Sequence, residues 1–364
     1  METTPEPSSL PPSPSLLVVD NFLAASGATT RTVNEDLADR LEGRGWRVLR
    51  TSRRQNRFLR LADMLLTVWR QRRAYDVALV GVYSGAAFFW AEAVTTLLKR
   101  LGKPVVLVLH GGNLPVFCRR WPRRAWRLWS QADQLVAPSP FLPARISLPP
   151  GKSRLIPNPL ELSAYPFRLR DRVAPRLVWL RAYHDLYQPE VALAVMAILA
   201  KTIPDLRLAM AGPEKTPGAA AALRVLAGRL GVADRIDWGG KQAKPAVPAW
   251  LSRGDIFLNT SQVDNTPVTL LEAMALGLCV VSTDAGGIPF LVEDGVDGLL
   301  APTGDAMALA ERVRRLLGDP ALAARLSAAG RRKAETCDWS RVLPQYETVL
   351  RETGTHEIQL GTPF

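Results

Sequence analysis

The densest group of residues with chemical potential lies between Asn259 and Pro302, where acidic, polar and glycine positions follow an apolar strand. Asp264 is expected in a loop, and a helix is expected to begin near Thr266 and Pro267, because proline is favoured at the first helical position. The unpaired N–H groups and the dipole of a helix start attract phosphate. Glu272, inside that helix, is suited to accept hydrogen bonds from two neighbouring hydroxyls of a sugar.

Asp264 and Glu272 are also a candidate acid/base pair of the kind that cleaves glycosidic bonds. Eight residues of continuous helix would separate their Cα atoms by about 12 Å, beyond the ~5 to 9.5 Å between such carboxyl groups, although a loop position for Asp264 shortens this. A third interpretation is that Glu272 makes only a local cap or ion pair. Hydrolase chemistry is therefore disfavoured, and the local role stays open.

Alternating strand and helix patterns predict an α/β fold built on parallel sheets. Strands are expected at residues 16–19, 76–83, 104–110, 134–137, 177–180, 206–211, 256–259 and 279–283. The first helix is expected to be capped by Thr29 or Thr30 and to carry Val33, Leu37 and Leu41 at four-residue spacing. Two doubly wound domains of this kind would enclose a cleft beyond the carboxyl ends of their strands.

Composition shifts suggest the limits of the two domains. Residues 1–15 are rich in Pro and Ser and are expected to form a disordered tail. The first domain is expected over 16–168 and the second over 172–337, joined through a Pro- and Arg-rich linker at 160–175. Residues 338–352 are expected to form a final helix, and 353–364 a flexible tail.

The excess positive charge of the chain lies in its first half. Residues 1–170 hold 25 Lys and Arg against 12 Asp and Glu, while 171–364 hold 21 against 22, so the halves carry +13 and −1. This asymmetry indicates an anionic partner: a membrane surface, a phosphate-bearing substrate or nucleic acid. Nucleic acid is disfavoured because no helix-turn-helix, zinc or RNA-binding signature accompanies the charge.

Two segments, Arg50–Arg73 and Arg119–Trp129, contribute much of this charge and interleave arginines with Trp, Phe and Leu. Such basic amphipathic segments suit the interface of an anionic membrane. The alternative is an ordinary helix with solvated arginines and core-facing apolar residues. Under that alternative the core positions would be Leu59, Leu61, Met64, Leu65 and Trp69.

Other features favour a cytoplasmic protein, peripheral on the inner face of the membrane. Three cysteines far apart suit a reducing compartment, and no segment has the pattern of a signal peptide. The longest apolar run, residues 77–91, is shorter than the ~18 residues needed to span a bilayer. No D-x-D occurs, and His184 and His356 lack partners at ligand spacing, so neither a metal nor another cofactor is expected.

The stretch from Asp264 to Leu300 resembles the donor-binding signature of family 4 retaining glycosyltransferases. It contains an acidic residue, a Glu after seven intervening positions, the pattern LEAMA, a Val-Val strand, Gly-Gly-Ile-Pro and DG..GLL. His110-Gly111-Gly112 and Ile156-Pro157-Asn158 resemble other elements of the family in the same order, so the likeness covers about residues 16–352. It implies the two-domain GT-B architecture, with helix 338–352 crossing back onto the first domain.

The resemblance also implies a function. The chain would move a sugar from a nucleotide diphosphate sugar to a hydroxyl of a glycan or lipid-linked acceptor, with retention at the anomeric carbon. Glu272 would hold the ribose, Asp264 the donor sugar and Arg181 the diphosphate. His110 would contact the sugar near the reaction centre. The remaining donor-binding candidates are Gly27, Lys241, Asn265 and Thr266.

Two positions depart from the family pattern. Asp264 stands where the family usually has Glu, and Tyr187 stands where it usually has a second phosphate-binding Lys. Lys241 or Lys215 is a candidate replacement for that cation. The departures motivate an alternative, a catalytically weakened binding or scaffold subunit of a glycan-assembly complex. A nucleotide-sugar epimerase of the same architecture is a further alternative.

Overall fold

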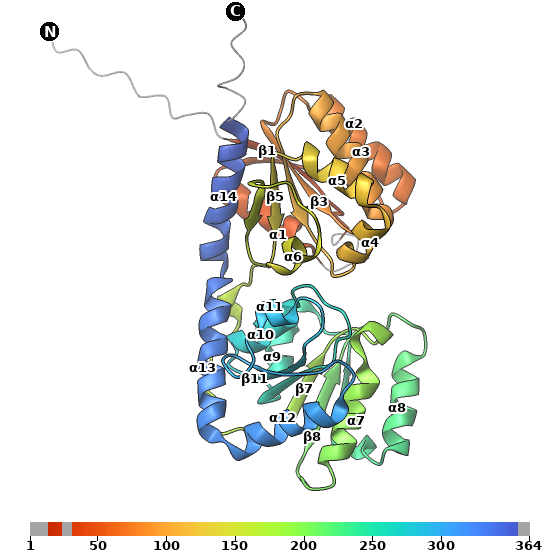
Figure 1. Ribbon diagram of the computed structural model, residues 1–364, viewed down its shortest axis with the longest axis vertical. Coiled ribbons are helices and arrows are strands. Elements are labelled where there is room, and N and C mark those ends of the chain that lie inside the picture. The colour runs from red at the N-terminus through yellow and green to blue at the C-terminus, as the bar shows by residue number, and fades with distance from the viewer. Residues whose placement is uncertain (1–13, 24–30, 356–364) are drawn as a thin grey trace, which may run out of the picture.

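The computed structural model describes residues 14–23 and 31–355, and within them the strands form two parallel six-stranded sheets. The first has the order β2-β1-β3-β4-β5-β6 and the second β12-β11-β10-β7-β8-β9. The strands of the first are β1 (Ser15–Val19), β2 (Arg47–Thr51), β3 (Val77–Val82), β4 (Val105–Leu109), β5 (Gln134–Ala137) and β6 (Ser153–Leu155). Those of the second are β7 (Arg176–Leu180), β8 (Arg207–Ala211), β9 (Ile236–Gly240), β10 (Ile256–Asn259), β11 (Cys279–Thr283) and β12 (Leu299–Ala301). The predicted α/β fold of two doubly wound sheets is confirmed (Figure 1).

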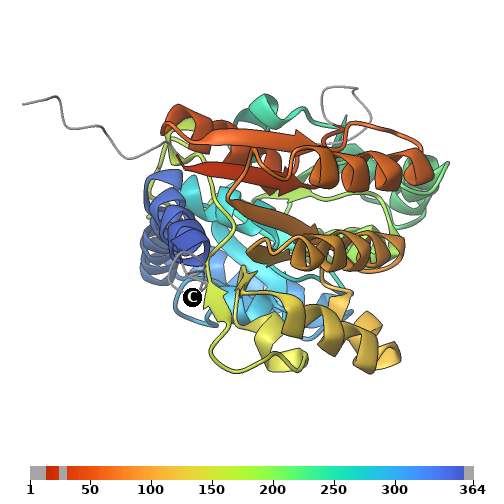
Figure 2. The same cartoon turned by 90° about the horizontal axis from the view of Figure 1, so that it is seen from above.

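Helices cover both faces of each sheet. On the first sheet, one face packs against α1 (Val33–Gly43) and α14 (Trp339–Thr355), and the other against α2 (Arg57–Arg70), α3 (Ala86–Arg100), α4 (Leu114–Arg120), α5 (Pro122–Gln131) and α6 (Phe141–Arg145). Figure 2 shows α2, α3 and α5 on the opposite side from α14. On the second sheet, one face packs against α7 (Pro189–Leu199), α8 (Ala219–Arg229) and α12 (Ala306–Gly318), and the other against α9 (Val247–Leu251), α10 (Val268–Ala275) and α11 (Ile288–Leu291). α13 (Pro320–Thr336) packs along α10.

Four strands were not expected from the sequence, and the first helix has a different cap. β2, β6, β9 and β12 lie at sheet edges and lack the long apolar runs of the central strands. The cap of α1 is Thr32, whose hydroxyl accepts from the N–H of Glu35 while the Glu35 carboxylate accepts from the N–H of Thr32. The predicted caps, Thr29 and Thr30, were therefore wrong and lie outside the described residues.

The chain crosses between the two sheets twice, and the two crossings lie side by side. The Leu160 N–H donates to the Cys337 carbonyl at 2.8 Å, and the Trp339 N–H donates to the Leu160 carbonyl at 3.1 Å. After the second crossing, α14 runs along the first domain (Figure 1). Trp339, Val342 and Leu343 are buried there in the core of the first sheet.

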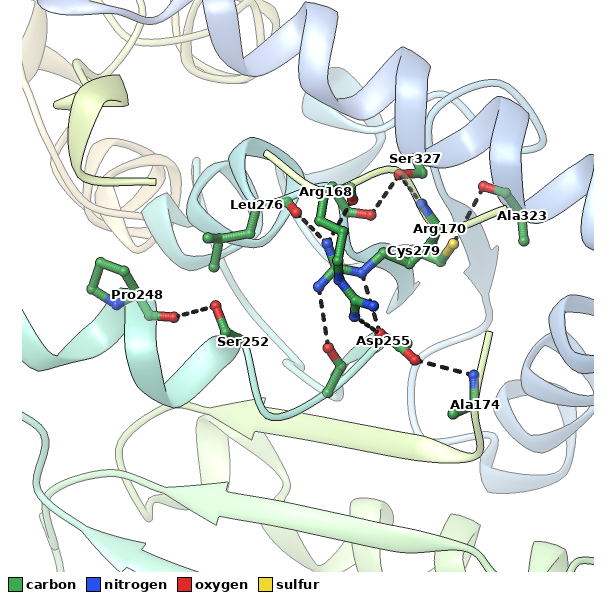
Figure 3. A network of polar contacts seen from close by, with 12 residues as sticks. Arg168, Arg170, Ala174, Pro248, Ser252, Asp255, Leu276, Cys279, Ala323 and Ser327 are labelled. Atoms are coloured by element: carbon green, nitrogen blue, oxygen red, sulfur yellow. Dashed lines mark hydrogen bonds and ion pairs between the residues drawn. The ribbon is translucent and has the colours of Figure 1, made fainter. Parts of the chain in front are cut away.

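The segment 160–175, expected to be a linker, is anchored to the second domain by a buried arginine (Figure 3). The Arg170 side chain donates to the Asp255 carboxylate at 3.2 Å, to the Arg168 carbonyl at 2.6 Å and to the Leu276 carbonyl. Asp255 also accepts from the Arg168 guanidinium and from the Ala174 N–H. Burial lowers the pKa of Arg170. Arg170 and Asp255 are both buried, so each of these two charges depends on the other for compensation.

We predict that Asp255→Ala destabilises the protein by about 3 kcal/mol or more, because it leaves the buried Arg170 charge without its partner. The change would be measured as the free energy of unfolding in urea. Asp237→Ala is the matched control, since its ion pair with Arg253 is half exposed and such pairs contribute at most about 1 kcal/mol. Equal effects of the two substitutions would contradict an anchoring role for Asp255.

Candidate active site

The strand order of the second sheet places Arg181 and Asp264 at one point. The chain leaves β7 toward β8 and β9 on one side, then returns to β10 on the other, so the connections after β7 and β10 diverge. A crevice at such a divergence is the usual ligand site of a doubly wound sheet. Arg181 follows β7 directly, and Asp264 follows β10 by five residues. The fold therefore brings these two predicted residues together.

Arg181 is held on several sides. Its guanidinium forms an ion pair with Asp264, and its Nη1 lies 3.4 Å from the Thr269 hydroxyl. The guanidinium also stacks over the Tyr187 ring, 4.2 Å from its centroid. Burial lowers the pKa of Arg181, yet a guanidinium remains charged in proteins. Tyr187, which stands where the family pattern has Lys, thus supports the cation of Arg181 instead of adding a second one.

Glu272 is buried and has partners that the sequence did not indicate. The Tyr165 hydroxyl donates to its carboxylate at 2.8 Å, and Lys244 forms an ion pair with the same oxygen. Both partners come from segments remote in sequence: Tyr165 from the chain between the domains, and Lys244 from the connection that follows β9. Glu272 thus forms an ion pair with a partner remote in sequence instead of a local one, and its carboxylate also borders a cavity.

That cavity, the donor hollow, has a volume of about 510 Å³ and is lined by Arg181, Lys241, Lys244, Thr269 and Glu272 among others. The N-terminal residues Val268 and Thr269 of α10 form part of its wall, and no side chain caps this helix. The helix begins one residue later than predicted, with Pro267 as its N-cap. Lys241 lines the hollow, whereas Lys215 does not. Four cationic residues, Arg31 of the first domain included, and a helix N-terminus therefore surround one space.

His110 lies beyond β4 in the first domain, within a buried polar network. Its ring stacks on Tyr83, with centroids 4.9 Å apart, and its Nε2 lies 3.4 Å from the Asn34 amide nitrogen. That same nitrogen donates to the Asp20 carboxylate at 2.6 Å. Burial lowers the pKa of His110 to about 4 and raises that of Asp20. The imidazole is therefore neutral at pH 7.

Glycines bring the His110 loop against the Asp264 loop. A Cβ atom on Gly112 would lie 3.0 Å from the carbonyl carbon of Asp264, and one on Gly286 would lie 2.2 Å from the Asp264 oxygen. A Cβ on Gly287 would lie 1.9 Å from the Asn265 oxygen. Only glycine allows these approaches. The close contact places His110 and Asp264 on facing sides of the cleft between the domains.

Several buried polar atoms at this contact have no hydrogen-bond partner within the described part of the chain. They are the Asn265 Oδ1, the Thr266 Oγ1 and the Arg181 Nε. Buried polar atoms are nearly always paired in native proteins, so a group of unpaired atoms is suited to a polar ligand. Gly27, the remaining predicted site residue, lies outside the described residues.

The alternative acid/base pair is not supported by these contacts, because Asp264 pairs with Arg181 while Glu272 pairs with Lys244. Over residues 14–23 and 31–355, no group of three or more His, Cys, Asp or Glu side chains is arranged to hold a metal ion. His184 instead accepts from the Leu186 N–H and begins a short 3₁₀ turn. His356 is outside the described residues.

Two family models match adjoining parts of the sequence. The model described as glycosyl transferases group 1 matches residues 178–333, and the model described as glycosyltransferase family 4 matches residues 23–164. The chain belongs to glycosyltransferase family 4. The resemblance identified from the Asp264–Leu300 stretch is thereby confirmed.

This family 4 chain is similar to parts of characterised relatives. It is 31% identical over 160 residues to a D-inositol 3-phosphate glycosyltransferase of Streptomyces avermitilis, a match that covers 42% of the chain and 34% of the relative. It is 42% identical over 103 residues to the amylovoran biosynthesis glycosyltransferase AmsK of Erwinia amylovora, covering 27% of the chain and 25% of the relative. The chain thus matches about a third or less of the length of these two proteins.

Similar solved structures establish the architecture. A sucrose-phosphate synthase of Thermosynechococcus elongatus superposes with a TM-score of 0.76 at 18% identity, covering 93% of this chain and 98% of that one. Anabaena HepE in complex with UDP and glucose superposes with a TM-score of 0.71 at 18% identity, covering 93% and 99%. The two-domain GT-B fold expected from the sequence is confirmed.

We predict that His110 makes the family 4 chain sensitive to acid. Since folding lowers its pKa from 6.5 to about 4, the unfolded chain binds a proton that the folded chain does not. The stabilisation from burying neutral His110 is complete above pH 6.5 and is lost as the pH falls toward 4. By pH 5 the free energy of unfolding should have fallen by about 1 to 2 kcal/mol. His110→Gln should reduce this loss in urea unfolding at pH 7 and pH 5. His184→Gln is the control, and an unchanged pH dependence in His110→Gln would contradict the prediction.

Proposed function

We propose that the protein is a retaining glycosyltransferase that moves a sugar from a nucleoside diphosphate sugar to a hydroxyl acceptor. The observation that carries this proposal is the donor hollow, where Arg181, the N-terminus of α10 and Glu272 border one space. Cations and a helix start are suited to a diphosphate, and a buried carboxylate to ribose hydroxyls. UDP is present in the complex of the similar Anabaena HepE, which supports a donor of this class.

Each part of the donor then has a complementary group. The ribose lies at Glu272, whose carboxylate is oriented by the Tyr165 hydroxyl. The diphosphate lies between Arg181 and the start of α10, and Lys241 is the second cation. The sugar extends toward His110 and the unpaired atoms of Asn265 and Thr266.

The chemistry follows from this placement. The bond between the anomeric carbon and the diphosphate oxygen breaks, the acceptor oxygen bonds to the same face of that carbon, and the acceptor proton passes to the departing diphosphate. Arg181 stabilises the charge that grows on the departing diphosphate, a contribution that is larger in the transition state than in the ground state. His110, being neutral, hydrogen-bonds the sugar without adding a positive charge near the anomeric centre. We propose that no metal or other cofactor takes part.

A panel of UDP-, GDP-, ADP- and dTDP-sugars tests the function. Release of nucleoside diphosphate, with transfer to a supplied glycoside, is the expected result for one donor. Binding without release would instead support a scaffold subunit, and conversion of the sugar without an acceptor, followed by NMR, would support an epimerase. Arg181→Ala should lower kcat more than it weakens donor binding.

We predict that Asp264→Asn tightens binding of the nucleoside diphosphate while lowering turnover at least tenfold. Asp264 neutralises Arg181, so a diphosphate must compete with that carboxylate. Removing the competitor should lower Kd roughly three- to tenfold, equivalent to about 1 kcal/mol, as measured by calorimetry. Asp205→Asn, exposed in the same domain, is the control. Weaker nucleotide binding in Asp264→Asn would refute this competition.

We further propose that the enzyme works in the cytoplasm, peripherally on the inner face of an anionic membrane, with a lipid-linked glycan as acceptor. The expected segments 50–73 and 119–129 lie largely in α2, α4 and α5, in the helix layer shown in Figure 2. Exposed apolar residues of this layer are Phe58, Leu59, Leu66, Trp69, Phe89, Val116, Trp121 and Trp126. Among the described helices, none is both long and apolar enough to cross a bilayer.

The core-facing alternative for α2 holds only in part. Met64 is buried, but Leu59 and Trp69 are 60% and 51% exposed. Instead, Arg60 and Val68 join Met64 on the buried face. The outward face of α2 is therefore apolar and flanked by arginines, which favours an interface over a merely solvated surface.

We predict that the protein co-sediments with vesicles containing anionic phosphatidylglycerol and does so less at high salt. Each basic residue near such a surface contributes roughly 1 kcal/mol before screening. Phe58→Ser with Trp69→Ser should remove the binding that persists at high salt, because that part is apolar. Three Arg→Gln changes on α12, at Arg312, Arg314 and Arg315, are the control for lost charge. Vesicle binding that does not depend on the content of anionic lipid would contradict this membrane site.

A further inference from the structure

A hollow lined mainly by arginines lies where α4 ends and α5 begins. It has a volume of about 390 Å³, and its lining residues, which define the arginine hollow, are Arg120, Trp121, Pro122, Arg123, Arg124 and Arg127. No carboxylate is among them. Four of its six lining residues are therefore arginines.

Most of this charge is uncompensated within the described part of the chain. Arg124 pairs with Glu92 at 2.6 Å. Among the described residues, Arg120, Arg123 and Arg127 form no ion pair with a carboxylate, and the Arg120 guanidinium lies over the Trp121 ring. Like charges held together repel, and a bound anion removes that repulsion. Guanidinium groups bind phosphate oxygens in pairs, so the arginine hollow fits a phosphate.

The N-terminus of α5 adds to the positive potential of the arginine hollow. Pro122 is the first residue of α5, a helix of ten residues whose N-terminus no side chain caps. The positive end of the helix dipole thus points toward the arginines that surround this turn. The helix start supplements the arginine cluster, which is the main observation.

The position of the arginine hollow relates it to the candidate active site. α4 begins at Leu114, four residues after His110, and ends at Arg120, which lines the hollow. Seven residues of helix rise about 10 Å, so an anion in the hollow would lie roughly that far along α4 from the His110 loop. In Figure 1, α4 lies on the side of the first domain that faces the second, and α5 lies farther from it.

The surroundings of the arginine hollow are apolar and exposed. Val116, Trp121 and Trp126 are 52%, 42% and 47% exposed. Exposed aromatic and aliphatic groups beside a phosphate site suit a ligand that joins a phosphate to an apolar chain. A soluble sugar phosphate would leave these side chains in water.

We propose that the arginine hollow binds the phosphate or diphosphate of an amphiphilic acceptor, whose hydroxyl-bearing end reaches His110. The inference rests on the proposed function, because it names the acceptor class of that same transfer. It distinguishes a specific phosphate site from general attraction to a membrane.

The test compares two double variants of the full chain that remove equal charge from the same helix layer. Arg123→Gln with Arg127→Gln alters the arginine hollow, and Arg57→Gln with Arg70→Gln alters exposed positions of α2. Calorimetry with inorganic pyrophosphate is expected to show two sites in the wild type, one of them the donor hollow. The first variant should lose one site, and the α2 variant should lose none. Equal behaviour of the variants would overturn the proposal.

Two further measurements separate free phosphate, lipid and catalysis. Both variants should lose a similar share of binding to phosphatidylglycerol vesicles, whereas only the hollow variant should raise KM, at least tenfold, for a phosphorylated alkyl glycoside acceptor. KM for the unphosphorylated alkyl glycoside should stay within twofold. Hydrolysis of the donor without acceptor should be unchanged in both variants. Its loss in the hollow variant alone would assign these arginines to the donor and overturn the proposal, whereas failure of the wild type to use any donor would count against the proposed function. A KM that rises equally for both acceptors would overturn the phosphate assignment.

Discussion

The backbone of Asp264 and Asn265 is enclosed by glycines of both domains, and the geometry of the site depends on this close packing. Gly112 approaches from the first domain, and Gly286 and Gly287 approach from the second. The Gly287 N–H also donates to the Asp264 carbonyl at 2.9 Å. Because no side chain separates these loops, the residues they carry meet across the cleft. The glycines are thus as much a part of the site as the side chains that they bring together.

The two buried charged groups of the donor side, Arg181 and Glu272, each have a partner of opposite charge. Arg181 is balanced by Asp264, and Glu272 by Lys244 and the Tyr165 hydroxyl. An unpaired buried charge is costly, which explains why these pairs form. In the proposed complex a diphosphate takes the place of Asp264 at Arg181, while ribose hydroxyls donate to Glu272 beside Lys244.

The sequence predicts the central strands and the donor side of the site because both are encoded locally. Apolar runs identify the buried strands, and the spacing from Asp264 to Leu300 identifies α10 and its neighbours. Edge strands such as β9 were not predicted because they are half exposed and lack a continuous apolar run. The capping box of Thr32 and Glu35 was readable from its spacing, and an apolar strand followed by Asp20 was a signal for the His110 network.

Other contacts of the site had no local signal. Tyr165 lies 107 residues from Glu272, and Lys244 lies 28 residues from it. Asn34 is 76 residues from His110. Only the packing of the domains and of the chain between them creates these pairs, so spacing rules cannot reveal them. For the same reason, the anchoring of Arg170 by Asp255 could not be distinguished from an exposed linker arginine.

The paired crossings of the chain constrain how the cleft can open. Leu160 is hydrogen-bonded to both Cys337 and Trp339, so the two connections form a short parallel ribbon between the domains. Two connections bonded to each other restrict rotation of one domain against the other more than a single connection would. Any opening of the cleft is therefore expected to occur by bending at Leu160 and Asp338, a motion that keeps His110 facing the Asp264 loop.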